Sequence, residues 1–238
     1  MHDKHISSAF DHDLETLQAL IMKMGGLVEA SIQQGVQAFL ERDEVLAGQV
    51  RANDSKIDAL ESAVNDEAAR VIAIRNPMAT DLRTVISVMK ISGNLERIGD
   101  YTKNLAKRTT VLATMQPITG VAPAIRRMAR DVERMLKDAL DAFARRDAEL
   151  AQQVIGADEE VDQMYNAVFR ELLTHMMEDP RTITAGMHLH FIAKNMERMG
   201  DHVTSIAEQV LYLVTGETPE EARTKGDRTA LMDADGVV

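Results

Sequence analysis

The stretch FLERDEVLAGQVRANDSKID (residues 39–58) returns later in the chain as FARRDAELAQQVIGADEEVD (residues 143–162). Nine of the twenty aligned positions are identical at a constant offset of 104 residues. A second match places NLERIGDYTKNLAKR (94–108) over NMERMGDHVTSIAEQ (195–209) at an offset of 101. Two matches in the same order are hard to attribute to shared helical composition. The sequence therefore indicates an internal duplication.

Helical periodicity runs through the repeated unit. Val50, Ile57 and Val64 recur every seven residues, which is typical of a helix with one buried face. Arg42-Asp43 and Arg146-Asp147 are predicted to be tight turns whose Asp caps the next helix. Pro77 and Pro180 are predicted to start the third helix of each repeat. Because the turns are short, successive helices should be antiparallel neighbours. The predicted helices lie near residues 9–42, 44–75, 78–112, 124–145, 148–178 and 181–215.

The predicted fold is all-α, with two tandem, sequence-related three-helix bundles built from six long antiparallel helices. Residues 1–112 form the first repeat and residues 113–123 the connection. Residues 124–215 form the second repeat. Residues 216–238 are a polar, aperiodic tail that we predict to be disordered.

Composition excludes several classes of function. The net charge of −11 leaves no extended basic face for nucleic acid, and it disfavours attraction to an anionic membrane. The absence of cysteine excludes disulfides and thiolate metal sites. The longest uncharged stretch, 109–125, is broken by Pro117, Gly120 and Pro123, so no membrane insertion is expected. The N-terminus has no apolar segment typical of a secretory signal.

Pairs of acidic residues recur at matching places in the duplicated unit. The members of each pair are four residues apart, so on a helix their Cβ atoms lie about 5–6 Å apart on one face. Like charges in that arrangement cost roughly a few tenths of a kcal/mol per pair, and the repetition of the pattern is therefore informative. The pairs are Asp54/Asp58, Glu96/Asp100, Asp158/Asp162 and Glu197/Asp201.

Counting from the turns places these acids at equal heights. With Pro77 as the centre of the turn, Asp58 is level with Glu96, and Asp54 is level with Asp100. The same count around the second proline turn levels the acids of the second copy. Equal height does not determine how each helix is rotated about its axis, so it does not show that the acids face one another. The count still predicts that both copies carry their acids at one level on neighbouring helices.

Clustered carboxylates with no interleaved cation would repel one another unless they were protonated or bridged by cations. An all-oxygen set suits Mg²⁺, Mn²⁺ or iron, and it can hold several ions. Gly99 and Gly200 lie within each E-x-x-G-D run, where a bare backbone permits close approach. The alternative is a solvated acidic face in which Arg97 and Arg198 serve as ion-pair partners. Spacing alone leaves both interpretations open.

Known catalytic signatures are absent from the sequence. It contains no phosphate-binding loop, no G-x-S-x-G and no H-E-x-x-H. The Glu-x-x-His pair of di-iron carboxylate bundles is also missing. We therefore predict a non-enzymatic protein. A metal-cluster enzyme and a metal-free helical scaffold remain the alternatives.

Four segments resemble the PhoU family of phosphate-transport regulators, and the doubled E-R-x-G-D motif at a spacing near 100 residues is specific to that resemblance. The similarity extends over nearly the whole chain, up to about Gly216. The segments are KHISSAFDHDLETLQALIMKMGGLVEASI (4–32), IRNPMATDLRTVISVMKISGNLERIGD (74–100), MMEDPRTIT (176–184) and NMERMGDH (195–202).

The resemblance implies a cytoplasmic, homodimeric accessory protein of bacterial phosphate uptake. Such a protein holds the phosphate-starvation response off when phosphate is plentiful. It would link the ATP-binding subunit of a phosphate ABC transporter to a phosphate-sensing histidine kinase. Some family members bind multinuclear iron or zinc clusters through paired acidic motifs, which correspond here to the four pairs above. One departure is that Asn104 continues the four-residue rhythm in the first copy, whereas Ser205 stands there in the second.

Overall fold

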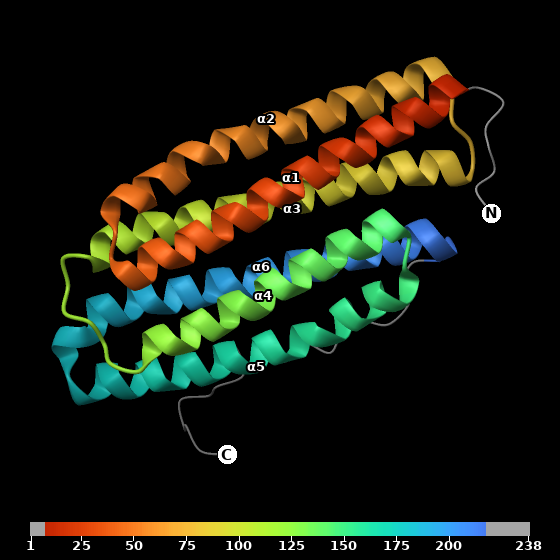
Figure 1. The fold of residues 1–238 in the computed structure, drawn as a ribbon. Coiled ribbons are helices and arrows are strands. Elements are labelled where there is room, and N and C mark those ends of the chain that lie inside the picture. The colour runs from red at the N-terminus through yellow and green to blue at the C-terminus, as the bar shows by residue number, and fades with distance from the viewer. Residues whose placement is uncertain (1–7, 218–238) are drawn as a thin grey trace.

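The computed structural model describes residues 8–217 and is entirely helical in its regular elements over that range (Figure 1). The predicted all-α fold with two tandem three-helix bundles is confirmed. The predicted tail lies outside the described residues from residue 218 onward. The elements are α1 (Ser8–Glu41), α2 (Glu44–Arg75), α3 (Thr80–Leu112), α4 (Val121–Arg145), α5 (Ala148–Glu178), the 3-10 turn η1 (Pro180–Thr182) and α6 (Ile183–Thr215).

The first turn of each repeat is built as predicted. Arg42 and Arg146 both adopt left-handed backbone angles, with φ of 58° and 55°. The next residue then caps the following helix. The Asp43 carboxylate accepts hydrogen bonds from two backbone N–H groups at the start of α2, and Asp147 accepts one from Leu150 at the start of α5. These short caps make the first two helices of each repeat antiparallel neighbours.

Three helix starts differ from the prediction by two or three residues. The helix predicted from residue 181 begins at Ile183, because Pro180–Thr182 form the 3-10 turn η1. Pro77 does not begin α3, because Ala79 has a positive φ of 50° and the helix starts only at Thr80. Conversely, α4 starts at Val121, three residues earlier than predicted, and so includes the end of the predicted connection 113–123. Pro123 is tolerated there because the N–H groups of a first turn have no partner within the helix.

The two bundles lie side by side, with α2 and α5 on the outer flanks (Figure 1). Between the bundles α3 packs along α6, and α1 packs along α4. The pairing of α3 with α6 is antiparallel. Arg83, near the start of α3, lies over the Tyr212 ring near the end of α6, and Arg108, near the end of α3, contacts His188 near the start of α6. Equivalent helices thus face each other about an approximate two-fold axis.

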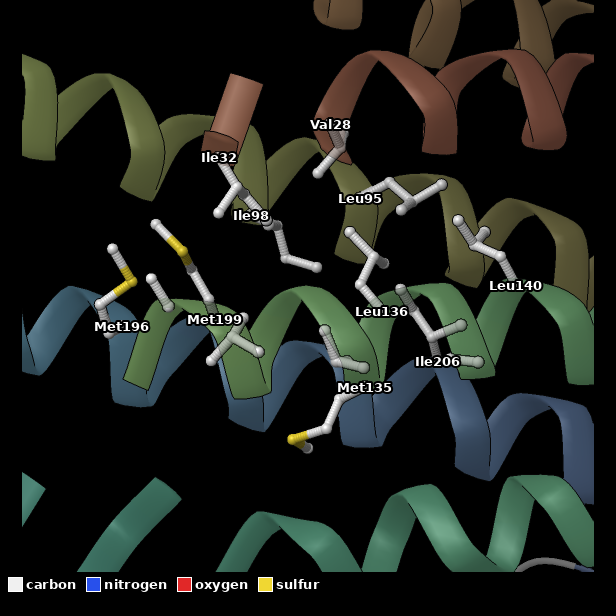
Figure 2. Close-up of a cluster of buried hydrophobic side chains, with 14 of the residues drawn as sticks. Val28, Ile32, Leu95, Ile98, Met135, Leu136, Leu140, Met196, Met199 and Ile206 are labelled. Atoms are coloured by element: carbon white, nitrogen blue, oxygen red, sulfur yellow. The ribbon is translucent and has the colours of Figure 1, made fainter. Parts of the chain in front are cut away.

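One hydrophobic core runs through both repeats. Figure 2 shows side chains of α1, α3, α4 and α6 meeting in it, among them Val28, Ile98, Leu136 and Met199. The repeats are therefore joined by packing along their whole length as well as by the connection. Within residues 8–217, no helix combines the length and the apolar character that a bilayer crossing requires.

Candidate metal centre

The acids of the first repeat gather between α2 and α3. Asp54 is buried, Glu96 and Asp100 are half-buried, and Asp58 is exposed. The pKa of Asp58 is raised by partial desolvation of its carboxyl group and by repulsion from Asp54; Lys103 offsets part of this rise, and Asp100 adds weakly to it. The pKa of Glu96 is raised by burial and by repulsion from Asp100. The structure therefore brings carboxylates of both helices into electrostatic contact.

A lysine lies among these acids. The Lys103 ammonium is 2.5 Å from Asp54 Oδ2 and 3.6 Å from Asp100 Oδ1. The hydrogen bond to Asp54 is the main reason why the pKa of Lys103 is raised. Arg97 adds looser contacts to Glu96 and Asp100, at 3.6 and 3.7 Å. Cations are therefore interleaved with the acids of this repeat, and Arg97 takes the ion-pair role named in the alternative interpretation.

The acids of the second repeat are more enclosed. Asp158, Asp162 and Glu197 are all buried, and Asp201 is half-buried. Lys194 donates to Glu197 Oε1 at 2.7 Å, and its ammonium also lies 4.8 Å from the centre of the Tyr165 ring. Burial raises the pKa of Glu197, the Lys194 ammonium offsets part of this rise, and repulsion from Asp201 and Asp162 adds to it.

Two further features of the second repeat suit a cation. Glu197 Oε2 is buried and has no hydrogen-bond partner, so one lone pair of a desolvated carboxylate is unmatched. A Cβ added at Gly200 would lie 3.1 Å from Asp158 Oδ1, so the glycine leaves that oxygen room on the α6 side. At Gly99 the corresponding Cβ would meet Ile57 first, at 3.0 Å, with Asp54 Oδ1 at 3.6 Å.

The side chains nevertheless do not converge as a metal site does. Across residues 8–217, no three Asp, Glu or His side chains form a group that could hold a metal ion. The two lysines occupy carboxylate oxygens that such a site would use. The carboxylate oxygens and the unbonded Glu197 Oε2 are suitable metal ligands. The lysine ammonium groups, however, already occupy the position that a metal cation would take beside Asp54 and Glu197.

Sequence reasoning missed the residues that make the two sites different. Lys103 stands three residues after Asp100, and Lys194 stands three residues before Glu197. Both spacings place an acid and a base on one helix face, so an i,i+3 search around each motif would have found them. The contribution of Tyr165 carries no such local signal, because it comes from the neighbouring helix α5.

Comparison with known proteins supplies the family. The PhoU domain model matches residues 21–109 and 125–210, once in each repeat. The phosphate-specific transport system accessory protein PhoU homolog of Caulobacter vibrioides is 45% identical over 224 residues, covering 94% of this chain and 97% of the relative. The protein of the same name from Zymomonas mobilis is 48% identical over 222 residues, covering 93% of each.

Solved structures agree with the sequence comparison. The crystal structure of PhoU from Pseudomonas aeruginosa superposes with a TM-score of 0.85 at 40% identity, covering 87% of this chain and all of that one. The phosphate transport system regulatory protein PhoU from Streptococcus pneumoniae gives 0.83 at 31% identity, covering 89% of this chain and all of that one. Family model, relatives and fold coincide over both repeats, and the chain therefore belongs to the PhoU family.

Proposed function

We propose that this chain is a regulatory accessory protein of phosphate-specific transport. It acts in the cytoplasm as a homodimeric adaptor between the ATP-binding subunit of a phosphate ABC transporter and a phosphate-sensing histidine kinase. It keeps the starvation response off while phosphate is plentiful. The observation that carries the proposal is the 45% identity, over 94% of the chain, to a relative named as a transport accessory protein.

An adaptor fits the molecule better than an enzyme. The relatives are named as accessory or regulatory proteins. The paired acidic motifs are carboxylates neutralised by lysine, an arrangement that can bind ions but presents no activated nucleophile among these residues.

We further propose that the paired acids bind metal ions as structural or modulatory ligands. The residues that would hold them are Asp54, Asp58, Glu96 and Asp100 in one repeat and Asp158, Asp162, Glu197 and Asp201 in the other. Iron, zinc, manganese or magnesium would supply positive charge that offsets the repulsion between these carboxylates. The unmatched Glu197 Oε2 supports the second repeat most directly.

A binding experiment tests the adaptor. The purified chain is mixed at high phosphate with the ATP-binding subunit and, separately, with the cytoplasmic part of the kinase, and complex formation is measured. We expect both partners to bind. A chain that binds neither would contradict the adaptor function.

Elemental analysis tests the metal. Wild-type protein is compared with the double variant Glu96→Ala/Asp100→Ala after exposure to each candidate ion and removal of excess. We expect a lower metal content in the variant. Equal content would contradict binding at this pair, and no metal in either protein would favour a metal-free scaffold. Turnover by the metal-loaded protein would instead favour a metal-cluster enzyme.

A further inference from the structure

Arg108, near the end of α3, is a cation with no acidic partner among residues 8–217. Its Cζ lies 4.1 Å from the centre of the Phe191 ring, and its Nη1 is 3.4 Å from His188 Nδ1, both on α6. Its Nε is buried and forms no hydrogen bond. Desolvation alone lowers the pKa of this guanidinium, so no carboxylate of the described helices acts on it. In a chain of 38 acidic residues, that is a specific arrangement.

The surroundings of Arg108 are apolar and accessible. Phe191, Met187 and Val111 each leave more than a third of their surface exposed. Met187 lies one turn before Phe191 on α6, and Val111 lies one turn after Arg108 on α3, so the four residues share one face of this helix pair. We name these four residues the Arg108 surface.

The composition of the Arg108 surface is that of a binding hot spot. Arginine, aromatic residues and methionine are enriched where partner proteins bury their surfaces, whereas lysine and glutamate are depleted there. A guanidinium that has lost water and gained only one neutral contact, to His188, is costly because its charge is uncompensated. A partner carboxylate would supply the missing negative charge, and apolar groups beside it would cover the Phe191 ring and the neighbouring aliphatic side chains.

The duplication provides an internal comparison. At the other end of the α3–α6 pair, Arg83 of α3 lies over the Tyr212 ring of α6, but at 5.6 Å from its centre, against 4.1 Å between Arg108 and the Phe191 ring. The methionine is replaced by an isoleucine of similar exposure, 38% against 41%. The equivalents of Arg108, Val111, Met187 and Phe191 are Gln209, Tyr212, Ile86 and Lys90. Both ends thus place a cation near a ring, but among the described residues only the Arg108 end combines the shorter contact with a guanidinium nitrogen that is buried and forms no hydrogen bond.

We infer that the Arg108 surface binds a partner protein through a segment that presents a carboxylate next to an apolar side chain. This inference rests on the proposed adaptor function for the identity of the partner, which is the ATP-binding subunit of the transporter. The accessory role named for the relatives points to the transport system itself, and charge complementarity to the unpaired guanidinium sets the chemistry of the contacting segment.

Site-specific photo-crosslinking tests the location. A photoreactive amino acid is placed at Met187 in one variant and at Ile86 in the control variant, and each is irradiated with the purified ATP-binding subunit. We expect a crosslink from position 187 and none from position 86. Equal crosslinking from both positions, or a crosslink from position 86 alone, would overturn the assignment.

Affinity measurements test the chemistry. The substitutions Arg108→Met and Phe191→Ala should each weaken binding of the ATP-binding subunit at least about tenfold, as loss of a hot-spot residue does. Arg108→Lys should weaken it less, and the matched control Gln209→Met should leave it unchanged. Arg108→Met should also unfold at the same or higher urea concentration than wild type, because it removes an unpaired cation, so lost binding cannot be ascribed to misfolding.

The outcomes separate the two proposals. Unchanged affinity in the Arg108 and Phe191 variants, with wild-type binding intact, overturns the Arg108 surface and leaves the adaptor function standing. A wild-type chain that binds the kinase but not the ATP-binding subunit also overturns the Arg108 surface as stated. A wild-type chain that binds neither protein overturns the adaptor function as well.

Discussion

Asp58 of the first repeat is exposed to solvent, whereas its counterpart in the second, Asp162, is only 5% exposed. The two residues occupy equivalent places on equivalent helices. The difference comes from their neighbours. The second repeat has Tyr165 where the first has Glu61, so a buried ring replaces a fifth carboxylate at the site. The same spacing of acids in the two repeats thus lies in two environments that differ in solvent exposure.

The counter-cations differ as well. Lys103 follows the acids of α3, and its equivalent on α6 is Thr204. Lys194 precedes the acids of α6, and its equivalent on α3 is Gly93. Each repeat supplies one ammonium group, but from opposite ends of its acidic run. The carboxylates therefore match between the two copies, whereas the lysines that neutralise them do not.

Removing acids should have the largest effect on metal affinity and should show which of the two acidic sites binds metal more tightly. We expect Glu197→Ala/Asp201→Ala to lower metal affinity in the second repeat by about a hundredfold or more, because ligand loss exceeds the 10–100-fold cost of losing a supporting group. Glu96→Ala/Asp100→Ala should remove a weaker site, since its acids are more exposed. Calorimetric titration of both double variants measures this. Equal residual affinities would show that enclosure does not matter.

Removing each lysine should separate the sites by stability. Lys194→Met should lower the free energy of unfolding at pH 7 by about 2 kcal/mol, because it leaves the buried Glu197 carboxylate uncompensated. Lys103→Met should cost about 1 kcal/mol, since the Lys103 side chain is 44% exposed against 24% for Lys194 and water screens its pairs more. Urea denaturation measures both. A larger loss for Lys103→Met would reverse the comparison.

The pH dependence of stability should report the ionisation of Glu197, the buried acid of the second repeat. The pKa of Glu197 is raised in the folded chain above its usual 4.5, so its ionisation opposes folding as pH rises from that value. We expect Glu197→Gln to be more stable than wild type at pH 7, because the ionised carboxylate is disfavoured in the folded chain. The gain should vanish below about pH 4.5, where both proteins are neutral at this position. A gain independent of pH between 4 and 7 would refute this account.

The paired glycines should give the smallest effects. In Gly99→Ala, the helix preference of about 1 kcal/mol for Ala is opposed by the shift demanded of Ile57, so stability should change by less than about 0.5 kcal/mol. In Gly200→Ala, the new methyl meets the Asp158 carboxylate, so metal affinity should fall by roughly two- to fivefold, as a small displacement of one ligand would cause. Thermal unfolding and metal titration of both variants check this. Equal changes in affinity would contradict it.

Local features of the fold were predictable where the chemistry was local. The turn at Arg42-Asp43 was predicted from a single capping side chain, Asp43. The equivalent Asp147 led to the same prediction in the second repeat, and both caps are present. The start of α3 was mispredicted because Pro77 can open a helix or precede a turn, and the backbone at Ala79 decides between the two. The pairing of α3 with α6 was not predictable, because periodicity shows that a face is buried but not against which helix.

The acidic residues show the same limit. Spacing from the turns predicted that acids of neighbouring helices share a level, and Asp58 does interact with Asp100 of the opposite helix. Burial of three of the four acids in the second repeat was not predictable, because it depends on helix rotation and on Tyr165. The lysine partners could have been predicted, because Lys103 and Lys194 each lie three residues from an acid of the motif. They were missed because only spacings between acids were compared.

The antiparallel contact of α3 with α6 has a consequence for symmetry. If two identical three-helix units associated in this way, each residue near the axis would have to tolerate its own copy opposite. In a single chain that restriction is lifted, and the equivalent positions 101 and 202 hold a tyrosine and a histidine whose rings lie 5.6 Å apart. Asn94 then contacts the His202 ring at 2.8 Å, while the amide nitrogen of its equivalent, Asn195, has no hydrogen-bond partner. Because both repeats belong to one chain, the two sides of this contact can carry different residues at equivalent positions.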